Sequence, residues 1–211
     1  MSLRHALAVG LVAIACSTAA HAQFSGDSIK GLLGNASDSA LDKLSKPGAF
    51  SADDAIRIAL PGAGKNLGGL MKLADQAGLT HDISGSLNRA AEQAAAEAKP
   101  IFRSAIDRMT LKDMGKIATG GKTAATDYLK RTSGGDILAK LTPLVKAALD
   151  QTGVLKQTSQ LSSLGYDDKK ITAYVSQKTS DGIFTYMGRE EAKARDDPVG
   201  TGSAILKGLK F

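Results

Sequence analysis

The sequence has 211 residues, of which 43% are hydrophobic and 4% aromatic, and its formal net charge is +6. One Cys and three His are too few for a metal site built on thiols or imidazoles, so we expect no metal and no cofactor. The basic residues are spread along the chain instead of forming a block, and nucleic-acid binding is therefore not expected. The length suits one domain with a single core.

Residues 1–22 have the pattern of a secretory signal peptide, because Arg4 precedes an apolar run and Ala20-His21-Ala22 is a small-x-small cleavage site. This run is too short to span a bilayer, and no later stretch is long enough for a transmembrane helix. Cleavage would leave 189 residues and remove one basic residue but no acidic one, which gives a net charge of +5. We expect an exported, periplasmic protein. The alternative is a lipoprotein anchored through Cys16, which ends a degenerate lipoprotein box.

Apolar residues at helical spacing predict helices along most of the chain, each ended by glycine or proline. Residues 23–50 are expected to form a loosely attached lead-in of two short helices, ended by Pro47-Gly48. Residues 51–211 are expected to form the helical domain itself. That domain would begin with a short capped helix running to about residue 60, followed by a helix over 67–77.

The strongest helical pattern spans residues 86–109, and Pro100 inside it predicts either a kink or a break into two helices. Two further helices should follow, the first ended by Gly120-Gly121 and the second by Gly134-Gly135. The longest apolar stripe of the chain comes next and is interrupted by Pro143. These signals predict short helices separated by glycine and proline.

Polar residues dominate the segment 152–165, which we interpret as a connection with weak helix. Asp167 or Asp168 should cap the next helix, and a separate helical pattern should lead into the charged run 189–197. An amphipathic piece at 205–211 could contact an anionic membrane surface, although docking on the domain's own core is favoured. No stretch alternates like a strand, so the predicted fold is all-α: a single domain forming an irregular bundle or array of short helices joined by Gly and Pro turns.

Several runs in the same order resemble a bacterial exported family known as domain of unknown function 4197. They are SLNRAAEQAAAEAKPIF at 86–102, Met109 to Asp113, AATDYL at 124–129, KTSDGIFTYMGREEAKARDDP at 178–198 and the final LKGLKF. The resemblance extends from about Leu60 to Phe211. It implies an exported helical domain and names no activity or substrate.

Two patterns that suggest chemistry have simpler interpretations. The sequence Gly-Gly-Lys-Thr at 120–123 resembles the end of a phosphate-binding loop, but Lys116 stands where the first glycine is needed and a helix precedes the loop. His81 is the only histidine left after cleavage, so a Ser-His-Asp relay would have to use it. We interpret the loop as a helix end and His81 as a surface or capping residue.

The charged residues suggest a polar network. Arg89 and Glu92 lie three residues apart among alanines, which would let another helix approach closely, and we predict that they reach the charged run near residue 190. The simpler alternative for that run is a solvated face on which Glu191 pairs with Arg195. The candidate residues for a polar network or binding surface are Asn88, Arg89, Glu92, Asp113, Glu190, Glu191 and Arg195.

Without a nucleophile and base at usable spacing, we expect a binding or interaction module, with a protein or small ligand as its partner, and not an enzyme. Two alternatives stay open: a carrier of an apolar or anionic small ligand between helices, and a hydrolase using Glu/Asp chemistry. A hydrolase predicts carboxyl groups of raised pKa in one cleft, whereas a carrier predicts an enclosed apolar cavity. An interaction module predicts an exposed apolar patch.

Overall fold

The computed structural model describes residues 26–59, 79–110, 112, 114–159 and 167–197. The regular elements in these residues are all helices, which confirms the all-α prediction. They are α1 (Gly26–Leu44), α3 (Leu79–Glu97), α4 (Lys99–Asp107), α5 (Met114–Ala118), α6 (Ala124–Thr152), α7 (Val154–Ser159) and α8 (Asp168–Asp196). None of these helices is both long and apolar enough to cross a membrane.

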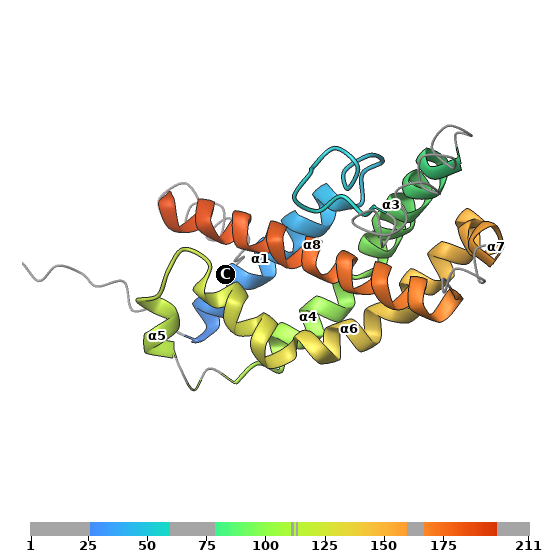
Figure 1. Cartoon of the computed structure of the whole chain (residues 1–211). Coiled ribbons are helices and arrows are strands. Elements are labelled where there is room, and N and C mark those ends of the chain that lie inside the picture. Colours follow the sequence, from blue (N-terminus) through green and yellow to red (C-terminus); the bar gives the residue numbers. More distant parts are fainter. Residues whose placement is uncertain (1–25, 60–78, 111, 113, 160–166, 198–211) are drawn as a thin grey trace, which may run out of the picture.

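The helices pack into a single domain around the two longest ones, α6 and α8, which have 29 residues each. These two helices contact each other along the molecule (Figure 1). Helix α1 packs against α8 and α4, while α3 packs against α6. Segments far apart in the sequence are therefore brought together along α6 and α8.

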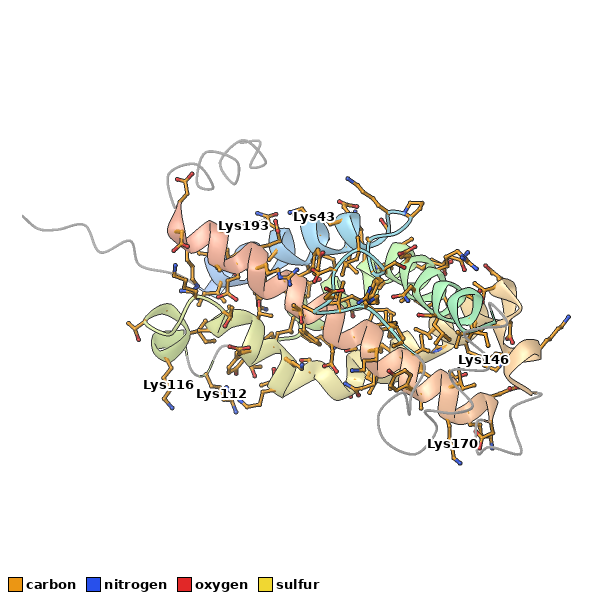
Figure 2. The ribbon with its side chains drawn as sticks, turned by 45° about the horizontal axis from the view of Figure 1, so that its top comes forward. Lys43, Lys112, Lys116, Lys146, Lys170 and Lys193 are labelled. Atoms are coloured by element: carbon orange, nitrogen blue, oxygen red, sulfur yellow. The ribbon has the colours of Figure 1, made fainter. Side chains whose placement is uncertain are left out.

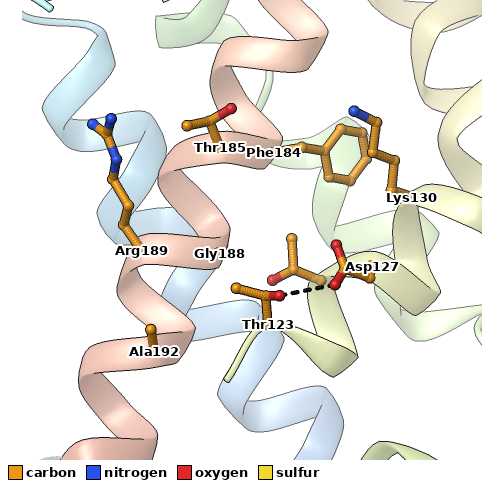
Figure 3. A pocket seen from close by; sticks show the side chains of 9 residues that line it. Thr123, Asp127, Lys130, Phe184, Thr185, Gly188, Arg189 and Ala192 are labelled. Carbon is orange, nitrogen blue, oxygen red and sulfur yellow. Dashed lines mark hydrogen bonds between the residues drawn. The ribbon is translucent and has the colours of Figure 1, made fainter. Parts of the chain in front are cut away.

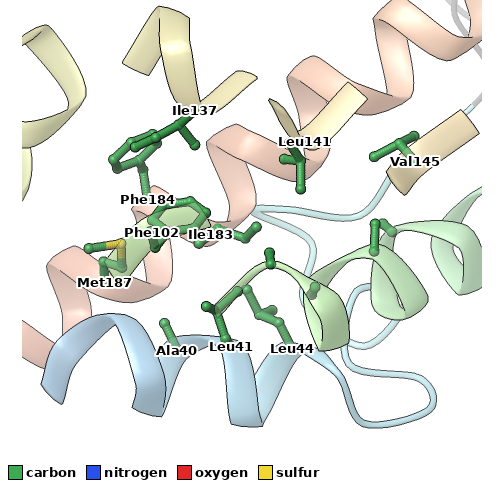
Figure 4. Packing of buried hydrophobic residues seen from close by; sticks show 14 of the residues in the cluster. Ala40, Leu41, Leu44, Phe102, Ile137, Leu141, Val145, Ile183, Phe184 and Met187 are labelled. Atoms are coloured by element: carbon green, nitrogen blue, oxygen red, sulfur yellow. The ribbon is translucent and has the colours of Figure 1, made fainter. Parts of the chain in front are cut away.

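One hydrophobic core joins these helices. Figure 4 shows Phe102 of α4 beside Phe184 of α8, and their ring centroids lie 5.6 Å apart in an edge-to-face arrangement. Burying a large apolar side chain contributes ~1.5–3 kcal/mol. Other buried members of the core are Leu33, Leu41, Leu44, Leu129, Ile137, Leu141, Val145, Ile183 and Met187.

The segment expected to be a loosely attached lead-in differs from the prediction. Residues 26–44 form one helix instead of two, and Ile29, Leu33 and Leu41 are buried in the common core. Gly34 lies inside the helix, where an added Cβ would be 3.1 Å from the Arg103 guanidinium. The apolar spacing continues on one face through this glycine, so packing outweighs a propensity cost of ~1 kcal/mol.

The break predicted as one alternative at Pro100 is present. Helix α3 ends at Glu97, and α4 begins at Lys99 after Ala98. Pro100 therefore occupies the first turn of α4, where its missing N–H would have no helical acceptor in any case.

Helix α6, in contrast, continues through its predicted stop at Gly134-Gly135, so the expected division there is wrong. Pro143, which was expected to interrupt the apolar stripe, also lies inside the helix. Two glycines and one proline cost roughly 5 kcal/mol in helix propensity. Apolar side chains before and after these positions in the sequence are buried only if the helix stays continuous, and their burial offsets that cost. These side chains include Ala125, Leu129, Ile137, Leu141, Val145 and Leu149.

Helix α8 is likewise one helix where two patterns were expected. Its predicted N-cap is confirmed, because an Asp167 carboxylate oxygen accepts a hydrogen bond from the Lys170 N–H at 2.8 Å. Gly182 allows a close approach in the middle of the helix, since an added Cβ would lie 2.8 Å from Cε1 of the buried Phe50. Gly153, with a φ of 74°, ends α6 before the short helix α7.

The loop 45–59 also differs from the prediction, because residues 51–59 form turns and extended chain instead of a short helix. Asp53 still accepts a local hydrogen bond, from the Ala55 N–H at 3.0 Å. The signal peptide, the predicted helix 67–77 and the amphipathic piece 205–211 lie outside the described residues.

Candidate functional site

Two of the nominated residues hold the loop 45–59 against α3. The Asn88 side chain accepts from the Ile58 N–H at 2.9 Å and donates to the Ile58 carbonyl oxygen at 2.8 Å. A Glu92 carboxylate oxygen accepts from the Phe50 N–H at 3.1 Å. Both side chains are buried, with exposed fractions of 1% and 5%. They satisfy backbone groups of a loop that has no regular secondary structure of its own.

Arg89 lies on a different face of α3. It is exposed and donates to the Ser86 hydroxyl at 2.6 Å. Asn88 and Glu92 are four residues apart and share a face, whereas Arg89 is turned about 100° from Asn88. The link that we predicted between Arg89, Glu92 and the charged run near residue 190 is not formed within the described part of the chain.

A second cluster ties the same loop to α8. Asp53 forms an ion pair with Arg189 and accepts from the Tyr186 hydroxyl at 3.0 Å. The hydrogen bond from Arg189, followed by that from the Ala55 N–H, lowers the pKa of Asp53 to about 2. The Arg189 guanidinium also lies 4.8 Å from the centroid of the Tyr186 ring. Loop 45–59 is therefore fixed to both α3 and α8.

Glu190 connects α8 to α1. Its carboxylate lies 2.6 Å from the Lys43 ammonium and 3.0 Å from that of Lys193, and it accepts from the Ser39 hydroxyl at 2.8 Å. Burial raises the pKa of Glu190, but the hydrogen bonds from Lys43, Lys193 and Ser39 together outweigh burial and lower the pKa to about 2.

Glu191 is fully buried and caps a different helix. Its carboxylate accepts from the Ala125 N–H at 3.0 Å and the Thr126 N–H at 2.8 Å, in the first turn of α6. The Thr123 side chain makes no capping bond, so α6 receives its capping carboxylate from α8.

Arg195 extends this contact to α5. Its Nε donates to Glu191 at 2.8 Å, and one of its terminal nitrogens donates to the Ile117 carbonyl oxygen at 3.1 Å. The predicted pair between Glu191 and Arg195 is thus present, but it joins three helices instead of forming a solvated face, with Glu191 fully buried and the Arg195 side chain 14% exposed.

One nominated residue cannot be placed, because Asp113 lies outside the described residues. The side chain of His81, interpreted above as a surface or capping residue, also lies outside them. The described residues contain no group of three or more His, Cys, Asp or Glu side chains that could hold a metal ion.

The surface lysines are scattered and mostly paired. Figure 2 shows labelled lysines on several elements and not on one face. Lys146 pairs with Asp150 at 2.8 Å, and Lys170 lies 3.8 Å from Asp167. Positive charge is therefore balanced locally at these positions.

Sequence reasoning missed an open groove between α6 and α8, shown in Figure 3. Its volume is about 330 Å³. The lining residues lie on the two facing helices and at the start of one of them: Thr123 directly before α6, Thr126, Asp127 and Lys130 on α6, and Phe184, Thr185, Gly188, Arg189 and Ala192 on α8. No local pattern could have revealed it, because it forms only where two distant helices meet.

Gly188 brings the first turn of α6 close to α8, since an added Cβ would lie 3.1 Å from Cγ2 of Thr123. Glu191, two residues after Arg189 on α8, holds the first turn of α6 by accepting from the Ala125 and Thr126 N–H groups. The spacing of the two walls is therefore fixed by a buried carboxylate.

The sequence that forms these helices matches a known protein family. The sequence profile of a family described as "Protein of unknown function (DUF4197)" matches residues 19–209. The chain belongs to this family. The match confirms the resemblance seen in the sequence and extends it toward the N-terminus. No curated protein and no solved structure was found to match this member of the DUF4197 family.

Proposed function

We propose that the chain is an exported helical binding module that holds a segment of a partner protein in the groove between α6 and α8. The groove itself is the observation that carries the proposal. Its volume of about 330 Å³ lies at the lower end of ligand sites, which are ~300–1,000 Å³. It is open to the surface and not enclosed, so one stretch of a longer chain can enter it.

The chemistry of the described residues favours this role over the two alternatives. A carrier needs an enclosed apolar cavity, whereas this groove is open and lined partly by hydroxyl and charged groups. A general acid needs a raised carboxyl pKa, whereas the pKa values of Asp53, Asp181 and Glu190 are lowered. In Asp181, burial raises the pKa, but the hydrogen bonds from Lys130 and Gln177 prevail.

Export is part of the same proposal and is supported by the signal pattern in residues 1–22. The mature protein should begin at Gln23 and carry no lipid. Intact mass of the protein recovered from the producing bacterium tests this directly. A diacylglyceryl group on an N-terminal Cys16 would contradict it.

Site-specific photo-crosslinking tests the binding role. A photoreactive residue replaces Thr185, which is exposed at the groove, or Ala147, which is exposed on α6 about 25 Å along the helix from Lys130 at ~1.5 Å per residue. We expect a discrete protein adduct from position 185 in the producing bacterium and none from position 147. Equal labelling at both positions, or none at either, would refute the groove as a binding surface.

A further inference from the structure

Three charged side chains line the groove between α6 and α8, and two of them are neutralised within the chain. The Lys130 ammonium lies 2.8 Å from an Asp181 carboxylate oxygen and 5.6 Å from the centroid of the Phe184 ring. Arg189 forms an ion pair with Asp53. Both cations of the lining are therefore held by partners, and a ligand anion would have to compete with those carboxylates.

Asp127 is the third charged residue, and it forms no ion pair with any described residue. Its Oδ2 accepts a hydrogen bond from the Thr123 hydroxyl at 2.8 Å, which orients the carboxylate in the lining (Figure 3). Its other oxygen, Oδ1, accepts from no group in the described part of the chain, and the residue is exposed. Together with the two paired cations and their partners, the groove has one negative charge without a counter-charge.

The N-terminus of α6 does not need this carboxylate as a cap, because its first four N–H groups have other acceptors. Two of them donate to the Glu191 carboxylate. The other two donate to backbone carbonyl oxygens, including that of the Asp127 N–H to Thr123 at 2.9 Å. The Asp127 carboxylate is therefore left for contacts on the groove side.

The groove has room for a long side chain beside Asp127. Its volume is about 330 Å³, and Thr185 and Ala192 on the facing helix have short side chains. Lysine and arginine lay their methylene groups along such a surface while the charged end reaches a carboxylate. The chain as a whole has a net charge of +6, so a cation would be selected by this local carboxylate and not by overall charge.

We propose that the partner segment held in the groove is basic, and that one of its lysine or arginine side chains forms an ion pair with Asp127. This inference rests on the proposed binding role of the groove and names the chemistry of the partner. The charged end of that side chain donates to the carboxylate oxygen that Thr123 leaves unbonded. Because the contact is an ion pair, binding weakens as the salt concentration rises.

Peptide titration followed by amide NMR of the full chain tests the charge. The probe is a short alanine peptide with a central lysine, capped at both ends. The same peptide with acetyl-lysine lacks only the charge, and one with glutamate reverses it. The lysine peptide should shift the amide signals of Asp127, Lys130 and Thr185 and bind at least about threefold more tightly than the other two. Its Kd should rise more than about twofold between ~50 and ~500 mM NaCl.

Asp127→Asn is the decisive variant, because it keeps the shape of the side chain and an acceptor oxygen for the Thr123 hydroxyl and removes only the charge. It should therefore fold like the parent. Its affinity for the lysine peptide should fall about three- to tenfold, the value of one partly exposed ion pair with a hydrogen bond. Asp136→Asn is the matched control, because it makes the same change of charge at an exposed position of α6 outside the groove lining, and it should bind like the parent.

The natural partner is tested by repeating the photo-crosslinking from position 185 in the producing bacterium. The segment captured by the parent should contain a lysine or arginine. The yield of this adduct should fall about three- to tenfold in Asp127→Asn and stay unchanged in Asp136→Asn.

The failures are distinguishable. An adduct that keeps its yield in Asp127→Asn, or a captured segment without a basic residue, would overturn the basic partner and leave the groove as a binding site. A lysine peptide that binds no better than the acetyl-lysine peptide would do the same. Absence of any adduct from position 185 of the parent would overturn the binding role of the groove and this inference with it.

Discussion

Replacing Glu191 by Ala should cause one of the largest losses of stability available from a single polar substitution in this chain. The side chain is fully buried, and its carboxylate receives two backbone N–H groups of α6 and Nε of Arg195. The alanine variant would leave all three donors without their acceptor. Water cannot replace the carboxylate without opening the contact between α6 and α8.

The magnitude follows from three contributions. Removing one member of a buried ion pair costs ~3–5 kcal/mol, and the lower end applies here because the remaining Arg195 side chain is 14% exposed. Loss of a helix N-cap costs ~1 kcal/mol, and each buried unsatisfied N–H costs ~1–3 kcal/mol. These contributions overlap, so we expect a total loss of ~4 kcal/mol in the free energy of unfolding. Glu191→Gln keeps one acceptor oxygen and should lose roughly half as much.

Urea denaturation measures the loss, with Glu97→Ala as the matched control because Glu97 is an exposed residue at the end of α3. The control should stay within ~0.5 kcal/mol of the parent. Hydrogen exchange should also accelerate at Ala125 and Thr126 before it accelerates in the middle of α8. A Glu191→Ala variant within ~1 kcal/mol of the parent, with unchanged exchange at these amides, would refute the role of Glu191 as the cap of α6.

Three further perturbations follow from the same contacts. Gly182→Ala should lose ~1–3 kcal/mol in thermal denaturation, because its Cβ would overlap the ring of the buried loop phenylalanine. Asn88→Ala should lose ~2 kcal/mol or more in urea, whereas Arg89→Ala on the exposed face should lose less than ~1. The folded-state pKa of Glu190 lies below its unfolded value, so the unfolded state binds more protons and stability falls as the pH drops from about 4.5 to about 2. Acid titration should show a shallower fall in Lys43→Met, and an identical profile would contradict the pairing.

The sequence predicted helices better than it predicted where they end. Asp167 could be recognised as an N-cap because capping depends on residues within one turn. The stop expected at Gly134-Gly135 was wrong because buried side chains on both sides of it, and beyond Pro143, keep α6 continuous. That stabilisation comes from tertiary packing, which local propensity does not contain.

The candidate site could be predicted only in part, for a similar reason. Asn88, Glu92 and Glu191 were nominated for a polar network or binding surface, and their partners in the structure include backbone groups on other elements. Backbone N–H groups are present at every residue except proline, so no residue type marks the ones that will donate to a particular side chain. Thr126 and Gly188 went unnoticed, because their importance depends on α6 and α8 being neighbours.

Native mass spectrometry of the protein purified from the cells that naturally produce it tests the binding role most directly. The parent is compared with Thr185→Trp, which fills the mouth of the groove, and with Ala147→Trp at the exposed control position on α6. We predict a bound mass on the parent and on Ala147→Trp that is absent from Thr185→Trp. A parent that carries no additional mass, or a bound mass that persists in Thr185→Trp, would contradict the groove between α6 and α8 as the binding surface.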